Sequence, residues 1–325
     1  MGTPRPLPDA LRKAPFSRQQ ALDLGLTSRQ LQHERFERLF PAVFRCRGHQ
    51  MSARDWVQAA RLTLPADAAT SHQARFVELG VEIGPLFPLH FTIARDLHLA
   101  ADRDRLFLHR TLVMPGVDSG GVSVPAALVG AASLLRRLDV VSLADWALHR
   151  GHVALGELRH VVEAEPWRPG AAQLKAALTL VDPRARSLPE SQLRCLLVAA
   201  GLPRPETNAD VHDSTGRFLA CGDLVYRWLR LLLEYEGRQH AANPYQFNRD
   251  IHRYAGLRDE AWCYLQVTAA MLGAPVTLVP AVHRVMVQQG YEGPAPSFSG
   301  SAWLELFDIP DGWRHDRRRQ GRAAS

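Results

Sequence analysis

Three acidic residues in the C-terminal third of the chain have the spacing of a metal site. They lie in CGDLVYRWLRLLLEYEGRQH, where Asp223 is followed after ten residues by Glu234 and then by Glu236. If the chain reverses around Trp228 and Leu229, antiparallel pairing opposes residues whose numbers add to 457, so Asp223 faces Glu234. Directly opposed residues share a face of a sheet, and strand periodicity places Glu236 on that face as well. The spacing predicts three carboxylates gathered where one strand ends.

A divalent cation would explain why three like charges lie together. Each carboxylate disfavours ionisation of its neighbours unless a positive charge lies between them. Mg²⁺ prefers oxygen ligands and keeps positions open for water and phosphate, and such an ion can polarise a phosphodiester and activate water. The pattern predicts a Mg²⁺ or Mn²⁺ site with Asp223 and Glu234 as ligands. Glu190, on the preceding helix, could complete the ligand set, and His240 could move a proton or contact phosphate.

The surrounding sequence predicts a small α/β domain that would position these carboxylates. Ser187 can cap a helix that Gly201 closes, and another helix begins after Asn243 with Pro244 at its first position. The expected order is a helix over 189–200, a hairpin of strands over 218–226 and 229–235, a helix from 244, a strand over 263–267 and a helix over 275–289. This order is typical of an α/β sandwich.

The same segment resembles a known nuclease family. Asp223, ten intervening residues and ExEGxxH, preceded by a helix that begins PES and followed by NRDIHR and a short strand, are similar to the small domains related to very-short-patch-repair endonucleases, in the PD-(D/E)xK superfamily. The resemblance covers about residues 187–291. It implies a restriction-endonuclease-like fold with Asp223 and Glu234 as metal carboxylates and Glu190 as the acid of the helix. Glu236 stands where the superfamily usually has a lysine that orients water.

Structural roles remain open for each of these residues. Glu190 follows Ser187 at the spacing of a capping box, which needs no metal. Asp223 could form a buried pair with an arginine such as Arg230. The two glutamates of the second strand could lie on an exposed face, and His240 could be a solvated turn residue.

The first fifty residues predict a winged helix-turn-helix. Ser17 can cap a helix over 18–24 that Gly25 ends, and Thr27 can cap a second helix over 28–34. The alternation of residues 36–45 around Pro41 predicts a small β-wing. Such a module places its second helix against DNA, so the predicted nucleic-acid contacts are Arg29, Gln30, Gln32, Arg38 and Arg45. An exposed polar face on any small helical domain would look the same.

The N-terminal half resembles the winged-helix and following domain of AbiEi-type antitoxins. The resemblance rests on three segments in order: GLTSRQLQHERFERLFPAVFR, TSHQARFVELG and LHRTLVMP. It implies DNA binding, a toxin–antitoxin or phage-defence context, and a cognate toxin or defence-system protein as partner.

Composition agrees with a nucleic-acid partner without requiring one. The chain has 39 Lys+Arg against 33 Asp+Glu and a net charge of +6, and nearly all the cations are arginine, which suits bidentate phosphate binding; GC-rich coding gives the same bias. Four widely spaced cysteines predict reduced thiols rather than zinc ligands or disulfides. No run approaches the roughly 20 apolar residues that cross a bilayer. We expect a cytoplasmic protein with no membrane partner.

The predicted fold class is α/β, in four parts. These are a winged helix-turn-helix over 1–50, a mixed α/β connecting domain over 51–185, the nuclease-fold domain over 186–292 and a flexible basic tail over 293–325. The connecting domain has no phosphate loop, nucleophile elbow or HExxH motif. The expected function is a metal-dependent DNA endonuclease localised by its winged helix. The alternative is a noncatalytic, antitoxin-like DNA-binding regulator.

Overall fold

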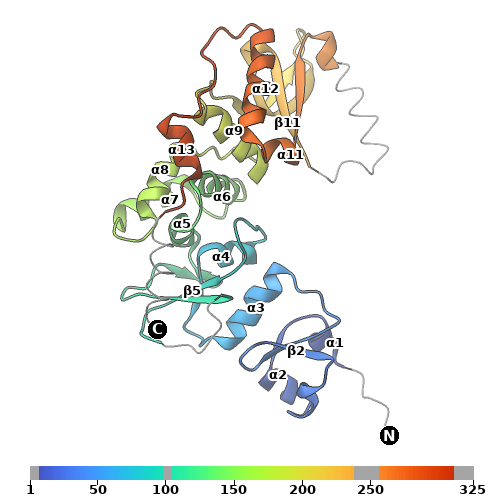
Figure 1. Ribbon diagram of the computed structural model, residues 1–325, viewed down its shortest axis with the longest axis vertical. Helices are drawn as coiled ribbons and strands as arrows, with labels where there is room; N and C mark the ends of the chain where they lie inside the picture. The colour runs from blue at the N-terminus through green and yellow to red at the C-terminus, as the bar shows by residue number, and fades with distance from the viewer. Residues whose placement is uncertain (1–6, 98–103, 238–255, 311–325) are drawn as a thin grey trace. The chain divides into compact units, whose positions relative to one another are not determined.

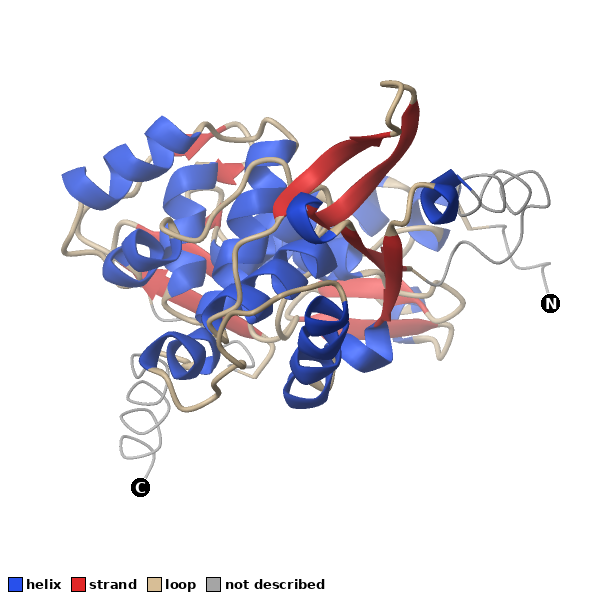
Figure 2. Ribbon diagram, turned by 90° about the horizontal axis from the view of Figure 1, so that it is seen from above, coloured by secondary structure: helices blue, strands red, loops and turns tan. Residues whose placement is uncertain are grey.

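The computed structural model describes residues 7–97, 104–237 and 256–310. The fold is mixed α/β, with several small sheets and many helices, drawn red and blue in Figure 2. The chain divides into two compact units, Met1–Ala131 and Ala132–Ser325, each with hydrophobic clusters of its own. Within the described ranges, no helix combines the length and the apolar character needed to cross a membrane. The predicted α/β class is confirmed at this level.

The first unit begins with a three-stranded sheet of order β1-β3-β2. Its strands are β1 (Phe16–Ser17), β2 (Phe36–Phe40) and β3 (Val43–Cys46), accompanied by helices α1 (Asp9–Arg12) and α2 (Arg18–Asp23). Ser17 caps α2 in a capping box with Gln20, as the sequence predicts for this serine. The β2–β3 hairpin lies where the sequence predicts a wing.

The second predicted helix of this segment is wrong in extent. Thr27 and Gln30 do form a reciprocal cap, with Thr27 N–H donating to the Gln30 side chain at 2.7 Å. Residues 28–34 nevertheless contain only the 3₁₀ turn η1 (Gln30–Gln32). Phe36 must reach the core, where its ring meets that of Phe16 at 5.8 Å, so the chain extends from His33 onward. Tertiary packing has overridden the local helical preference.

The rest of the first unit surrounds a second three-stranded sheet, of order β4-β5-β6. Every residue of the central strand β5 is buried; it pairs antiparallel with β4 and parallel with β6. The elements are α3 (Ala53–Thr63), β4 (Ala69–Thr70), α4 (His72–Leu79), β5 (Leu89–Ile93), β6 (Leu106–Arg110), β7 (Val117–Asp118), β8 (Gly121–Val122) and α5 (Val124–Ala132).

Three imidazoles stack inside this unit. The rings of His72 and His109 lie 3.9 Å apart at 11°, and His90 Nδ1 hydrogen-bonds to His109 Nε2 at 2.8 Å. Burial lowers the pKa of His109 to about 4, and burial with the neighbouring imidazoles lowers the pKa values of His72 and His90 well below the ordinary range. The stack is therefore uncharged at neutral pH.

Acidification should destabilise the first unit through this stack. The folded imidazoles bind protons less readily than unfolded ones, so their contribution is complete above about pH 6.5 and is lost as pH falls toward 4. Between pH 7 and 5 we expect a loss of about 2 kcal/mol from His109, with losses in the same direction from the other two imidazoles. Amide hydrogen exchange in α4 and β5 measures this, and His109→Phe, which keeps an aromatic ring, should reduce the pH dependence. An unchanged dependence in that variant would contradict the prediction.

The second unit is built on a four-stranded sheet of order β12-β11-β10-β9. Strands β9 (Glu206–His212), β10 (Phe218–Tyr226) and β11 (Leu231–Glu236) are antiparallel neighbours, and β12 (Cys263–Thr268) runs parallel to β11. The 3₁₀ turn η2 (Arg227–Leu229) joins β10 to β11. Helices α9, α11 and α12 lie beside the sheet (Figure 1). The helices are α6 (Arg137–His149), α7 (Leu155–Ala164), α8 (Ala171–Ala177), α9 (Leu188–Ala199), α11 (Ala269–Leu272), α12 (Pro275–Gln288) and α13 (Ser301–Phe307).

Two elements of this unit depart from the sequence prediction. Strand β9 was not predicted, because ETNADVH is poor in strand-favouring residues; it forms by pairing with β10. Helix α13 lies in the segment predicted as a flexible tail, and it packs against α6 and α9 with Trp303 and Leu306 buried. The prediction of a loose tail is therefore wrong for 301–307. The helix predicted from residue 244 lies largely outside the described residues.

A fully buried ion pair joins the helices beneath the sheet. Arg194 of α9 donates to the Asp145 carboxylate of α6 at 2.6 Å, and neither side chain is exposed. Arg194 also donates to the Leu180 carbonyl, and the other Asp145 oxygen accepts from Asp182 N–H at 2.7 Å. Burial raises the pKa of Asp145 to about 6, although the guanidinium favours its ionised form. The pair ties α6, α9 and the segment between α8 and α9 together.

Breaking this pair should cost much more than breaking an exposed one. Arg194→Met leaves a desolvated carboxylate without its partner, and we expect the free energy of unfolding to fall by about 3–5 kcal/mol. Arg227→Met removes the pair with Glu206, in which both side chains are nearly half exposed, and should cost less than about 1 kcal/mol. Urea denaturation of the two variants compares these values. Equal losses in the two variants would mean that burial does not increase the contribution of the Arg194–Asp145 pair to the free energy of unfolding.

Candidate functional site

The predicted register of the β10–β11 hairpin is confirmed. Strand partners are Leu224 with Leu233, Val225 with Leu232 and Tyr226 with Leu231, and each pair of numbers adds to 457. Asp223 and Glu234 come next beyond this ladder. The chain reversal lies at η2, where the sequence predicts it.

Asp223 is a half-buried carboxyl group held at the point where the two strands separate. One of its oxygens accepts the Tyr235 N–H at 2.8 Å. The preceding residue must be small, because a Cβ on Gly222 would lie 2.6 Å from the Leu232 side chain. Burial, and then the charges of Glu190 and Glu234, raises the pKa of Asp223 to about 7. The hairpin thus holds a carboxyl group whose ionisation is disfavoured unless a cation lies nearby.

Glu190 lies in the first turn of α9 and is buried. Its Oε2 accepts the Asn208 side-chain N–H at 2.6 Å and the Arg186 backbone N–H at 2.9 Å. Ser187 caps the helix, accepting the Glu190 N–H at 3.4 Å. The Glu190 carboxylate reaches back to Arg186 rather than to Ser187, so it anchors the segment before α9 to strand β9.

The remaining predicted acids differ in their surroundings. Glu234 accepts the Tyr264 hydroxyl at 2.8 Å, and Glu236 is exposed at the end of β11. Arg230, the alternative partner for Asp223, donates instead to the Glu260 carbonyl at 3.1 Å. His240 lies outside the described residues.

The donors at this site have the right chemistry for a hard cation, but their arrangement is not that of a closed metal shell. Within the described part of the chain, no three His, Cys, Asp or Glu side chains converge as metal ligands would. The oxygens of Asp223, Glu234 and Glu190 are the kind that Mg²⁺ and Mn²⁺ prefer. A cation between Asp223 and Glu234 would relieve the like-charge repulsion that raises the pKa of Asp223.

Sequence reasoning missed two residues of this site. Asn208 belongs to the unpredicted strand β9, where it adopts a left-handed φ of 46°, a conformation that asparagine tolerates. Arg186 precedes α9, and its charge reaches Asp223, lowering the pKa against the effect of the neighbouring acids. Neither residue lies within a recognisable motif. Arg186 contacts Glu190 locally, four residues along the chain, whereas only the folded chain brings Asn208 to Glu190.

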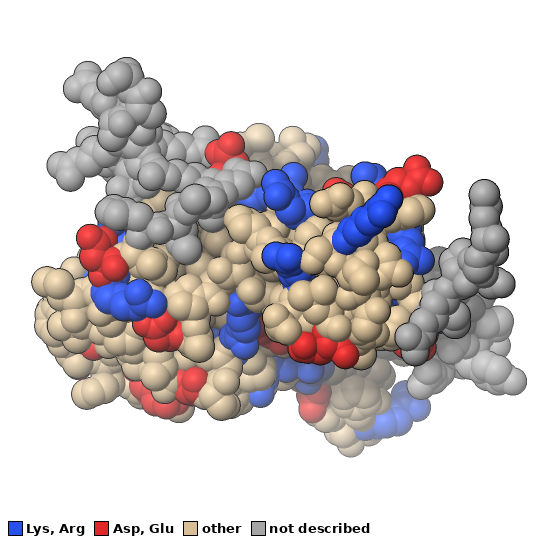
Figure 3. Space-filling model, turned by 90° about the horizontal axis from the view of Figure 1, so that it is seen from below, with Lys and Arg blue, Asp and Glu red and all other residues tan. Residues whose placement is uncertain are grey.

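The predicted nucleic-acid residues of the N-terminal segment fall into two groups. Arg29, Gln32 and Arg38 are exposed, and the two arginines take part in no ion pair among the residues described. On the face drawn in Figure 3, basic and acidic side chains are interspersed. Any contact between the N-terminal segment and nucleic acid would depend on a few separate side chains.

The other two predicted residues already have partners within the protein. The Gln30 side-chain oxygen accepts from Thr27 N–H. The Arg45 guanidinium donates twice to Glu37, at 2.7 and 2.9 Å, and once to the His49 carbonyl. Arg45 and Glu37 face each other across β2 and β3, so Arg45 stabilises the hairpin.

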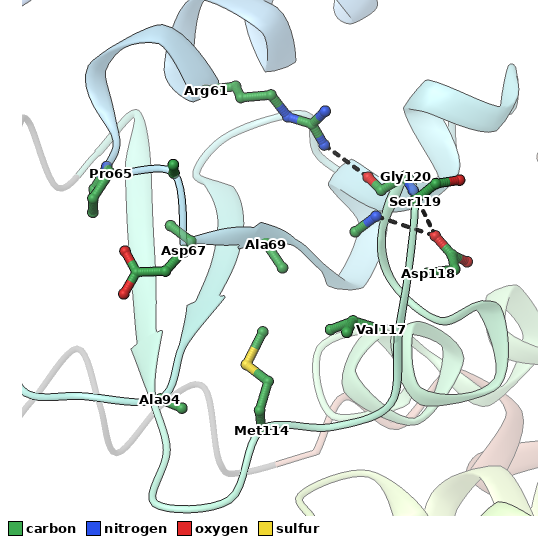
Figure 4. Close-up of a pocket in the computed structure, with 13 residues that line it drawn as sticks. Arg61, Pro65, Asp67, Ala69, Ala94, Met114, Val117, Asp118, Ser119 and Gly120 are labelled. Atoms are coloured by element: carbon green, nitrogen blue, oxygen red, sulfur yellow. Dashed lines mark hydrogen bonds between the residues drawn. The ribbon is translucent and has the colours of Figure 1, made fainter.

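A separate pocket of about 570 Å³ lies in the first unit (Figure 4). Its charged side chains are already paired: Arg61 with Glu78, Asp67 with Arg95 and Asp118 with Arg75. Asp118 also accepts from the Gly120 and Gly121 N–H groups, and Arg61 donates to the Gly120 carbonyl. These contacts account for the polar lining structurally and assign the pocket no chemistry.

Comparison with known proteins places the chain beside two relatives from Mycobacterium tuberculosis. They are "Uncharacterized protein MT2308" and "Uncharacterized protein Rv2248", each 30% identical over 139 residues, which is 43% of this chain and 51% of the relative. The chain therefore spans about half the length of the curated relatives it matches. No protein-family model matches the chain, and no solved structure matches it.

Neutralising Asp223 should stabilise the fold at high pH. Because the folded pKa is raised above that of an unfolded aspartate, its ionisation penalty is absent below about pH 4 and complete above about pH 7. Asp223→Asn keeps an acceptor for the Tyr235 N–H, and we expect it to raise the free energy of unfolding at pH 8 by about 2–4 kcal/mol, with no gain at pH 4. Urea titrations at both pH values measure this.

Glu206→Gln is the matched control. This acid of β9 is exposed and pairs with Arg227, so its neutralisation should change stability by less than about 1 kcal/mol at either pH. A destabilised Asp223→Asn protein at pH 8 would contradict the assignment of a desolvated, repelled carboxylate.

Proposed function

We propose that this protein is a metal-dependent DNA endonuclease that hydrolyses phosphodiesters at the β10–β11 hairpin. The observation that carries the proposal is the Asp223 carboxyl group, desolvated and close enough to Glu190 and Glu234 for both charges to raise its pKa to about 7. Desolvated acids with such shifts are concentrated at functional sites. The four-stranded sheet with α9 and α12 beside it supports the restriction-endonuclease-like sandwich that the sequence resemblance implies.

In this proposal Asp223 and Glu234 hold Mg²⁺ or Mn²⁺, and Glu190 contributes charge from the helix. The ion would supply Lewis-acid polarisation of the scissile phosphate. The Tyr235 N–H orients one Asp223 oxygen and the Tyr264 hydroxyl orients Glu234, so the protein holds both carboxylates by hydrogen bonds. Glu236, at the exposed end of β11, and His240 remain candidates for assisting the reaction.

The N-terminal segment is proposed as the winged-helix part that brings the enzyme to DNA. The short turn η1 presents only Gln30–Gln32, which favours phosphate contact by Arg29 and Arg38 over base reading by a long helix. Four free cysteines agree with a reducing, cytoplasmic setting. A cognate toxin or defence-system protein remains the proposed partner, from the resemblance alone.

A noncatalytic DNA-binding regulator is the second candidate. It is favoured by the arrangement of the acids, because in the described residues they do not converge as metal ligands would. Glu190 instead accepts hydrogen bonds from the Asn208 side chain and from the Arg186 N–H. If the protein is such a regulator, DNA binding should be unchanged by chelator and should be lost when the exposed N-terminal arginines are replaced.

A plasmid assay separates the two candidates. Incubation of the full chain with supercoiled plasmid and with single-stranded DNA, in Mg²⁺, Mn²⁺ or chelator, should give metal-dependent nicking that Asp223→Asn reduces at least about 10³-fold. Glu206→Gln should cleave like the original protein. Mg²⁺ should also raise the melting temperature of the original protein but not of Asp223→Asn. Cleavage that persists in Asp223→Asn would refute the site, and binding without cleavage in any metal would favour the regulator.

A further inference from the structure

Arg186 is an exposed arginine tied to the acidic site by its own main chain. Its N–H donates to Glu190 Oε2 at 2.9 Å, and the same oxygen accepts the Asn208 side chain at 2.6 Å. Asn208 in turn donates to the Arg184 carbonyl at 2.9 Å. Three hydrogen bonds therefore fix the backbone around Arg186 against strand β9 and the first turn of α9.

The Arg186 side chain extends from this anchored backbone toward β10. Its guanidinium lies beside the Cys221 thiol, two residues before Asp223, and lowers the pKa values of both groups against the effect of burial. Arg186 is exposed and enters no ion pair within the described ranges. The Arg186 charge is therefore not neutralised by a described carboxylate, and it lies at the solvent-exposed edge of the site.

Arg184, two residues earlier, is in a different state. Its Nε and Nη2 both donate to the Asp182 carboxylate at 3.2 Å, which neutralises its charge locally. The two arginines share a segment and an exposed setting, but Arg184 is paired with Asp182, whereas the charge of Arg186 acts on Asp223.

An acidic site repels a phosphodiester unless a cation faces the substrate. The charges of Glu190 and Glu234 both oppose ionisation of Asp223, and Glu236 adds an exposed acid at the end of β11. A guanidinium suits the planar, two-oxygen face of a phosphate. The Arg186 charge acts on Asp223 in the direction that favours the ionised carboxylate, and the Arg186 backbone is hydrogen-bonded to Glu190 of the same site.

We propose that Arg186 binds a backbone phosphate of the nucleic acid at the site formed by Asp223, Glu190 and Glu234. This inference rests on the proposed function for its substrate class, since it places the DNA backbone beside β10. It adds a substrate-binding residue from outside the predicted hairpin.

The test compares Arg186→Gln with Arg184→Gln in the full chain, because each variant removes one exposed arginine of the same segment. For a short DNA duplex in Mg²⁺, Arg186→Gln should lower kcat/KM by about tenfold or more, mainly through a higher KM. It should also reduce the slope of log Kobs against log salt by about 0.9, the value for one phosphate contact. Arg186→Lys should restore part of both, and Arg184→Gln should change neither more than about twofold. Thermal melting checks that all three variants are folded.

The binding measurement keeps this inference separable from the nuclease proposal. A reduced salt slope in Arg186→Gln, together with no cleavage of DNA by the original protein in either Mg²⁺ or Mn²⁺, would support the phosphate contact and refute the endonuclease. Cleavage by the original protein with equal slopes and equal KM values for Arg186→Gln and Arg184→Gln would overturn the inference and leave the endonuclease standing.

Discussion

The buried ion pair between Arg194 and Asp145 is the constraint on which the second unit depends. Two charges removed from water must satisfy each other and their remaining hydrogen-bonding capacity. Here the Leu180 carbonyl and the Asp182 N–H supply further hydrogen bonds, whereas Arg194 Nε has no hydrogen-bond partner among the described residues. Because these partners come from α6, α9 and the segment between α8 and α9, their relative positions are fixed together. The first turn of α9 is thereby held in place, and it carries Glu190 to the edge of the sheet.

The acidic site differs from the buried ion pair, because its charges repel one another instead of attracting. The hairpin places Asp223 where burial and two like charges disfavour its ionisation. The compensating contacts include the Tyr235 N–H on Asp223, the Tyr264 hydroxyl on Glu234 and the nearby Arg186 charge. A carboxyl group held in this way is destabilising when charged, as sites that bind a cation or move a proton commonly are. This cost is the physical argument for function at the hairpin.

In the first unit, the polar side chains mainly form hydrogen bonds and ion pairs within the unit itself. Arg45 closes the β2–β3 hairpin through Glu37, and Arg75 holds the Asp118 turn. The three stacked imidazoles are kept neutral by burial, so they act as packing groups at neutral pH. In the N-terminal segment, Arg29 and Arg38 are exposed and form no ion pair among the described residues.

The sequence by itself determined the local pattern: the caps at Ser17 and Ser187, the buried strands, and the hairpin register that sets Asp223 next to Glu234. These follow from side-chain periodicity and capping, which act over a few residues. Only the tertiary structure decided that 28–34 would be a short turn, that ETNADVH would become a strand and that Ser301–Phe307 would fold back as α13. It also brought Asn208 of β9 to Glu190. Packing and pairing between segments distant in the chain override weak local preferences, and no short-range pattern records them.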